Sequence, residues 1–166
     1  MSLLWSYFWP CLAAGLLVGV VAGLIAFRSR TRRKAALAVG LVVSLTFAAL
    51  WHGPLGAADR FTTRVERNAR EALNYYEMTK VTAHLHRGPL TRRLILAGPA
   101  DDFQTGELVR LFSQLPGVSR AQWTNAPGGP PLIVEAFGAA IGGYLFGLLL
   151  AYLVTLRRRY NAQWTW

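Results

Sequence analysis

Two histidines, His84 and His86, have the spacing in this sequence that most directly suggests chemistry. On an extended strand, residues two positions apart point to the same face, so both imidazoles could bind one metal ion. The third histidine, His52, lies at the edge of an apolar run, and no carboxylate or thiol cluster accompanies the pair. We therefore interpret the pair as a solvated strand face, and we expect no metal site and no cofactor of the protein's own.

Asp101, Asp102 and Glu107 are the carboxylates whose spacing suggests acid–base catalysis. Asp101, however, stands three residues before Gln104, which is the capping-box arrangement of a helix start. Asp102 then falls in the first helical turn, where the helix dipole favours negative charge. No serine, cysteine or histidine forms a recognisable nucleophile motif around these carboxylates. We therefore predict that the protein has no catalytic residues and is not an enzyme.

Glu135 is the one acidic residue inside a long apolar run. Such a group is costly in a membrane unless it is paired or hydrated, and it is a candidate functional residue by default. Because Glu135 follows Pro131 by only four residues, it is expected near the membrane surface, where it could reach water or pair with Arg60 or Arg64. We favour a topological or partner contact, with an ion or proton pathway as the alternative.

Three apolar runs, residues 3–27, 35–51 and 132–156, carry no charge apart from that glutamate. A helix needs about 20 apolar residues to cross the hydrocarbon core of a membrane. Hydrophobic residues make up 53% of the 166 residues, and the mean hydropathy is +0.28. We therefore predict three transmembrane helices. No Lys or Arg precedes Arg28, so the first run is expected to be an uncleaved span rather than a signal peptide.

Basic residues gather beside these runs. Residues 28–34 hold five of the 18 basic residues, and residues 157–159 hold three more. The positive-inside bias places both segments in the cytoplasm and the N-terminus on the opposite side. The net charge of +10 then reflects topology, and we expect no nucleic-acid partner. The predicted organisation is a helical hairpin at 1–53, an extramembrane domain at 54–131, a third transmembrane helix at 132–156 and a basic, aromatic cytoplasmic tail at 157–166.

Glycines recur every four residues in the first and third apolar runs. Such spacing lets the backbones of two membrane helices approach closely. A protein of three helices has little interior, so one glycine face of the third helix is expected to pack within the protein and the other against a partner. The glycines concerned are Gly15, Gly19 and Gly23 in the first run, and Gly138, Gly142, Gly143 and Gly147 in the third.

The segment between the second and third runs has the alternation pattern of a small α/β domain. Its apolar residues recur every three or four positions in two stretches, and every second position in others. The predicted elements are a helix of about 16 residues at 61–76, strands at 81–86 and 91–98, a helix from 101 to 115, and a strand at 118–123. The helices are expected to bury Phe61, Val65, Ala69, Ala72, Leu73 and Tyr76, and then Phe103, Leu108, Leu111, Phe112 and Leu115.

This αββαβ order, with an LxLxG strand, an acidic helix start and a PGV turn, resembles the BON domain, the bacterial osmoregulatory and nodulation module. Within 59–124 the matching residues are Leu94, Leu96, Gly98, Asp101 and Pro116-Gly117-Val118. The resemblance implies a BON-like extramembrane domain on the periplasmic face of a bacterial inner membrane, associated with lipid or partner proteins and without catalytic residues. Many members carry two copies or an attached channel domain, whereas this sequence has one copy, which counts against a pore.

From these patterns we predict a non-catalytic accessory or scaffold subunit of a bacterial inner-membrane complex, for example an electron-transfer or energy-converting one, with its N-terminus in the periplasm and its C-terminus in the cytoplasm. Other subunits and membrane lipids would be its partners. The alternative is a stand-alone or homo-oligomeric envelope-stress module that binds phospholipid. The headgroup contacts in that alternative would be Arg64, Arg67, Arg70, Arg92 and Arg93.

Overall fold

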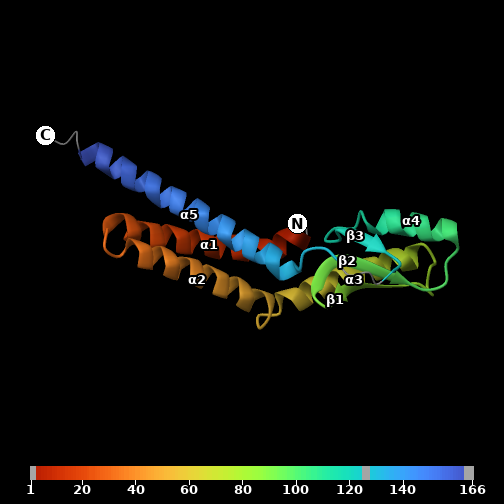
Figure 1. Ribbon diagram of the computed structural model, residues 1–166. Helices are drawn as coiled ribbons and strands as arrows, with labels where there is room; N and C mark the ends of the chain where they lie inside the picture. Colours follow the sequence, from red (N-terminus) through yellow and green to blue (C-terminus); the bar gives the residue numbers. More distant parts are fainter. Residues whose placement is uncertain (1–2, 125–127, 163–166) are drawn as a thin grey trace. The chain divides into compact units, whose positions relative to one another are not determined.

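The computed structural model describes residues 3–124 and 128–162 (Figure 1). The chain forms two compact units. One, here called the helical unit, comprises Phe8–Leu55 and Ala136–Trp166. The other, called the sheet unit, comprises Met1–Tyr7 and Gly56–Glu135. Each unit has its own packing and is described separately below.

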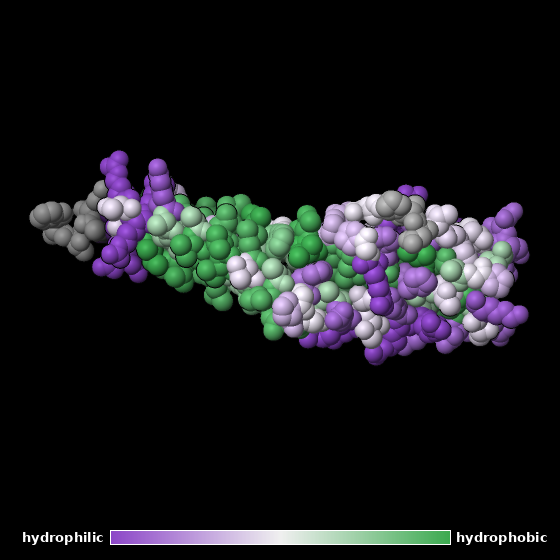
Figure 2. All heavy atoms as spheres, turned by 60° about the horizontal axis from the view of Figure 1, so that its bottom comes forward, coloured by the Kyte–Doolittle hydropathy of each residue, from purple (hydrophilic) through white to green (hydrophobic). Residues whose placement is uncertain are grey.

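Three long helices form the helical unit: α1 (Leu3–Arg28), α2 (Arg33–His52) and α5 (Leu132–Ala162). Each is long and apolar enough to cross a membrane. Figure 2 shows their continuous apolar surface, which ends at a hydrophilic band close to the C-terminal end of α5. The three apolar helices predicted from the sequence are therefore present.

The third helix is longer than predicted. The sequence placed residues 157–166 in a tail, whereas α5 continues through Arg157–Arg159 to Ala162. No glycine or proline follows Gly147, and positive charge is favoured at the C-terminal end of a helix, so nothing stops the helix at the apolar boundary. Residues 163–166 of the predicted tail lie outside the described residues.

The sheet unit contains the five elements in the predicted order. They are α3 (Ala57–Tyr75), β1 (Thr82–Arg87), β2 (Leu90–Ala97), α4 (Asp102–Phe112) and β3 (Arg120–Gln122). The sheet has the order β1-β2-β3, with β1 and β2 antiparallel and β2 and β3 parallel. Strand β3 has three residues, fewer than the predicted 118–123, because only Arg120–Gln122 pair with β2.

The core of the sheet unit lies on one face of the hairpin. Ala83 pairs with Leu96 and Leu85 pairs with Leu94, and all four side chains are at most 7% exposed. Helix α3 packs against β1, and the backbone N–H of Leu85 donates a hydrogen bond to Oε1 of Glu66 at 3.1 Å. The predicted stripe of α3 is buried at four positions: Phe61, Val65, Ala69 and Leu73.

Two residues that were predicted to be buried, Tyr76 and Phe103, are exposed. Tyr76 is 47% exposed because α3 ends at Tyr75, so Tyr76 leaves the helical face that Leu73 belongs to. Phe103 is 77% exposed. It lies five residues before the buried Leu108, which places it about 140° away around α4.

Asp101 caps α4 as predicted. Its side chain accepts a hydrogen bond from the backbone N–H of Gln104 at 2.7 Å, and Oε1 of Gln104 accepts one from the N–H of Asp101 at 3.2 Å. This carboxylate therefore has a structural task. Helix α4 ends at Phe112, earlier than the predicted Pro116-Gly117, because the chain then continues in tighter turns towards Gly117, whose φ is +99°.

Candidate functional site

Helices α1 and α5 approach each other at their glycines. A methyl group added at Gly15 would strike the carbonyl oxygen of Ala140, and one at Gly143 would strike that of Leu12. The contacts advance in step along both helices, since Gly147 meets the carbonyl of Leu16 one turn further on. The two helices therefore run in the same direction, with glycines from each against the backbone of the other.

The other predicted glycines of α1 take part in the same contact. A methyl at Gly19 would strike the carbonyl oxygen of Tyr144, and one at Gly23 would lie 2.6 Å from Cβ of Ala151. All three predicted glycines of α1 thus face α5. This contact is internal to the helical unit and leaves these residues no room for a partner helix.

Tyr144 joins all three helices and was missed by the sequence reasoning. Its hydroxyl donates a 2.7 Å hydrogen bond to the carbonyl oxygen of Leu37 in α2. Beside it, a methyl added at Gly40 would lie 2.7 Å from Cβ of Ala22 and 3.0 Å from the tyrosine ring. The signal in the sequence was the spacing of Gly40, Ser44 and Ala48, the three buried residues of α2.

Gly138 and Gly142 lie on the same helix as Gly143 and Gly147 but do not contact α1. Both are exposed, and a methyl added at either would meet no atom within 4 Å among the described residues. Large apolar side chains of α5 are exposed along with them: Ile141, Leu145, Phe146 and Leu149. The helix therefore has one glycine face in contact with α1 and one that contacts none of the other described residues.

Glu135 pairs with Arg92 in the sheet unit, a partner that the sequence did not suggest. Oε2 of Glu135 lies 3.1 Å from Nη1 of Arg92, and the two side chains are 23% and 21% exposed. The cause is a bridge between Thr91 and Pro131. This bridge places the first turn of α5, which contains Glu135, beside β2, and no pattern in the sequence indicated it.

The five arginines predicted to contact headgroups divide into two groups. Arg64, Arg67 and Arg70 are exposed on α3. Arg92 also donates from Nε to the carbonyl oxygen of Gly117 at 3.2 Å, so its guanidinium is held inside the sheet unit. Arg93 is half-buried, and its guanidinium lies against the backbone at 128–129. Of these five arginines, those on α3 present an open basic surface.

His84 and His86 line a hollow of about 850 Å³ on the sheet, together with Ile95 and Trp123. His84 is exposed, and Nδ1 of His86 lies 3.0 Å from the carbonyl oxygen of Pro89. No group of three metal-binding side chains occurs in the described part of the chain. The hollow therefore has two imidazoles and no further ligand among these residues.

Taken together, the described residues define a protein with three helices long and apolar enough to cross a membrane and one small unit with a three-stranded sheet. Comparison with known protein families, with curated proteins and with solved structures gives no match. The resemblance to the BON domain therefore stays a prediction. Gly98 has a local explanation of its own, because its φ is +144° and a methyl there would lie 2.6 Å from the carbonyl oxygen of Lys80.

Proposed function

We propose that this protein is a non-catalytic accessory subunit of a bacterial inner-membrane complex. The observation that supports the proposal is the second glycine face of α5, at Gly138 and Gly142, which no described residue covers. Small residues at this spacing allow a partner helix to approach closely. Because the first glycine face is already filled by α1, the second is available to another subunit.

The sheet unit fits the same proposal. In the predicted topology it lies in the periplasm and contacts the complex from that side. Two of its carboxylates have structural partners: Glu66 accepts a hydrogen bond from β1, and Asp101 caps α4. Any redox or transport chemistry would then belong to the other subunits. An electron-transfer or energy-converting complex is the example we favour.

The test is purification from native membranes in mild detergent without overexpression, followed by cross-linking mass spectrometry. We expect stoichiometric recovery of integral membrane subunits with cross-links to α5. The variant Gly142→Leu should reduce that recovery about tenfold, since overpacking typically costs 1–3 kcal/mol. Ala38→Leu is the matched control, because Ala38 is a small exposed residue of α2 outside this face. Recovery of the protein alone, or with lipid only, would overturn the proposal.

A second candidate is supported by α3. Arg64, Arg67 and Arg70 are spaced three residues apart and exposed, so they form one basic stripe along the helix. This arrangement favours a module that binds phospholipid headgroups. Binding to anionic vesicles should then weaken steeply as salt is raised, because exposed charges are screened, whereas recovery through helix packing should not change. Vesicle sedimentation across a salt series distinguishes the two candidates.

A further inference from the structure

The basic end of the helical unit contains a hollow of about 350 Å³ between its three helices. Three arginines line it: Arg30 from the α1–α2 loop, Arg33 from α2 and Arg159 from α5. Every acidic residue of the chain lies between Asp59 and Glu135, so the helical unit has no carboxylate side chain to neutralise them. Among the described residues, this hollow is therefore a concentration of positive charge with no acidic side chain of the helical unit to balance it.

The start of α2 adds to the attraction for an anion. Its N-cap residue, Arg32, makes no side-chain hydrogen bond to the helix, and the first turn contains no acidic residue. The first backbone N–H groups of a helix have no partner within it and carry partial positive charge. Arg33 is held above the ring of Phe27, with its guanidinium carbon 5.9 Å from the ring centroid. Side chains and backbone thus favour the same kind of ligand.

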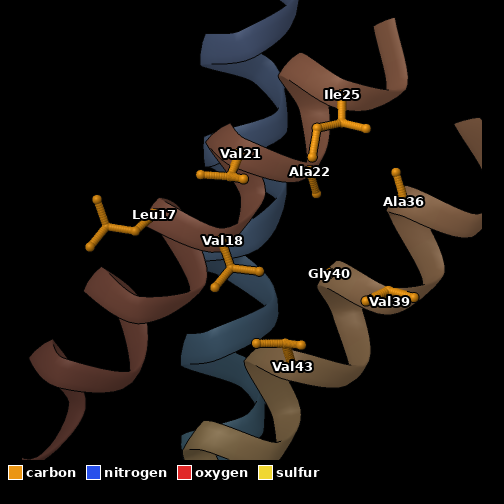
Figure 3. Close-up of a pocket in the computed structure, with 9 residues that line it drawn as sticks. All are labelled: Leu17, Val18, Val21, Ala22, Ile25, Ala36, Val39, Gly40 and Val43. Carbon is orange, nitrogen blue, oxygen red and sulfur yellow. The ribbon is translucent and has the colours of Figure 1, made fainter. Parts of the chain in front are cut away.

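An apolar groove of about 390 Å³ lies between α1 and α2. Figure 3 shows side chains of both helices along it, among them Leu17, Val21 and Ile25 from α1, and Val39 and Val43 from α2. Its lining is entirely aliphatic or glycine. From its first to its last lining residue on α1, the groove spans roughly 12 Å of helix, which is close to one leaflet of a hydrocarbon core about 30 Å thick.

Helix geometry connects the groove to the basic hollow. Arg33 lies three residues before Ala36, a residue that lines the groove, so both occupy one face of α2. On α1, Arg28 follows the groove residue Ile25 by three positions. An apolar chain in the groove would therefore end beside arginines. An elongated ligand with an apolar chain and an anionic end matches both parts.

We propose that this surface is a binding site for one anionic phospholipid, with an acyl chain in the groove and the phosphate at Arg30 and Arg33. The charge of the hollow selects for negative headgroups, and the aliphatic groove selects for a lipid over a free anion. A partner helix would fill the groove without using the arginines at its end. The inference does not depend on the subunit proposal, because it needs only that the three helices lie in a membrane.

The test is native mass spectrometry of the full chain in neutral detergent, titrated with phosphatidylglycerol, with phosphatidylcholine or with inorganic phosphate. We expect the first phosphatidylglycerol to bind at least about tenfold more tightly than phosphatidylcholine. The double variant Arg30→Gln/Arg33→Gln should lose about tenfold in phosphatidylglycerol affinity, and the control Arg157→Gln/Arg158→Gln, with the same charge change outside the hollow, less than about threefold.

A second pair of variants tests the groove. Val39 and Val42 are both 61% exposed on α2, but only Val39 lines the groove. Val39→Trp should block the acyl chain and reduce binding, while Val42→Trp should not. Circular dichroism checks that all variants keep their helices. Equal effects of the two tryptophans, equal binding of both lipids, or inorganic phosphate binding as tightly as phosphatidylglycerol would overturn the proposal. So would disulfide cross-linking of Val39→Cys to another protein chain.

Discussion

The two glycine pairs of α5 have the same residue type and the same spacing, yet their environments are opposite. Gly143 and Gly147 touch the backbone of α1, whereas Gly138 and Gly142 touch nothing within 4 Å among the described residues. A glycine spacing therefore marks a surface that permits close approach, and the rest of the chain decides whether the approach is made internally. The same lesson applies to the arginines, since Arg92 is held by Glu135 while Arg64 is exposed.

The largest expected effect separates the two glycine pairs. Gly143→Leu would drive a side chain into the backbone of α1, and we expect it to lower the free energy of unfolding of the helical unit by about 3 kcal/mol or more. In Gly142→Leu the new side chain meets no described residue, so the free energy of unfolding should change by less than about 0.5 kcal/mol. Denaturant unfolding in detergent, followed by tryptophan fluorescence, measures both. Equal losses would mean that the two faces do not differ as described.

A smaller effect is expected at the arginines of the sheet unit. Arg92→Gln removes the ion pair to Glu135 and the hydrogen bond to Gly117, and should cost about 1–2 kcal/mol of stability. Arg64→Gln, on exposed α3, should cost less than about 0.5 kcal/mol. Combining Arg92→Gln with Glu135→Gln should give less than the sum of the single losses. Additive losses would show that the pair is not energetically coupled.

The smallest expected effect concerns the hydrogen bond between Tyr144 of α5 and Leu37 of α2. Tyr144→Phe removes the hydroxyl that donates to the carbonyl oxygen of Leu37 but keeps the ring against Gly40. Hydrogen bonds between membrane helices contribute about 0.6 kcal/mol to stability on average. We therefore expect the free energy of unfolding to fall by about that amount. The thermal midpoint of the variant in detergent checks this. A loss as large as that of Gly143→Leu would mean that the hydroxyl, rather than close packing, holds the helices together.

The elements could be predicted because their signals are local. Apolar runs predicted the long helices, alternation predicted the hairpin, and Asp101 with Gln104 predicted the start of α4, since each pattern is complete within a few residues. The partner of Glu135 could not be predicted, because it depends on the bridge between Thr91 and Pro131, 40 residues apart. Phe103 was misplaced because an apolar residue near a helix start need not share the face of those that follow.

The sequence predicted which residues form the candidate site, but it did not predict which other residues they contact. Seven glycines were identified by spacing, and only coordinates separate those that meet another helix from those that do not. The role of Tyr144 was missed because an aromatic residue in an apolar run carries no mark of the helix it will bond to. A search for small residues in α2 would have found Gly40, and with it the position of that contact.

The pairing of α1 with α5 also constrains how the chain is made. The glycines and the backbone groups that they meet are separated by about 130 residues of sequence, which take roughly 6–26 s to synthesise at typical translation rates. During that interval α1 exists without the helix that fills its glycine face. Newly made α1 and α2 must therefore remain without this contact until α5 emerges from the ribosome.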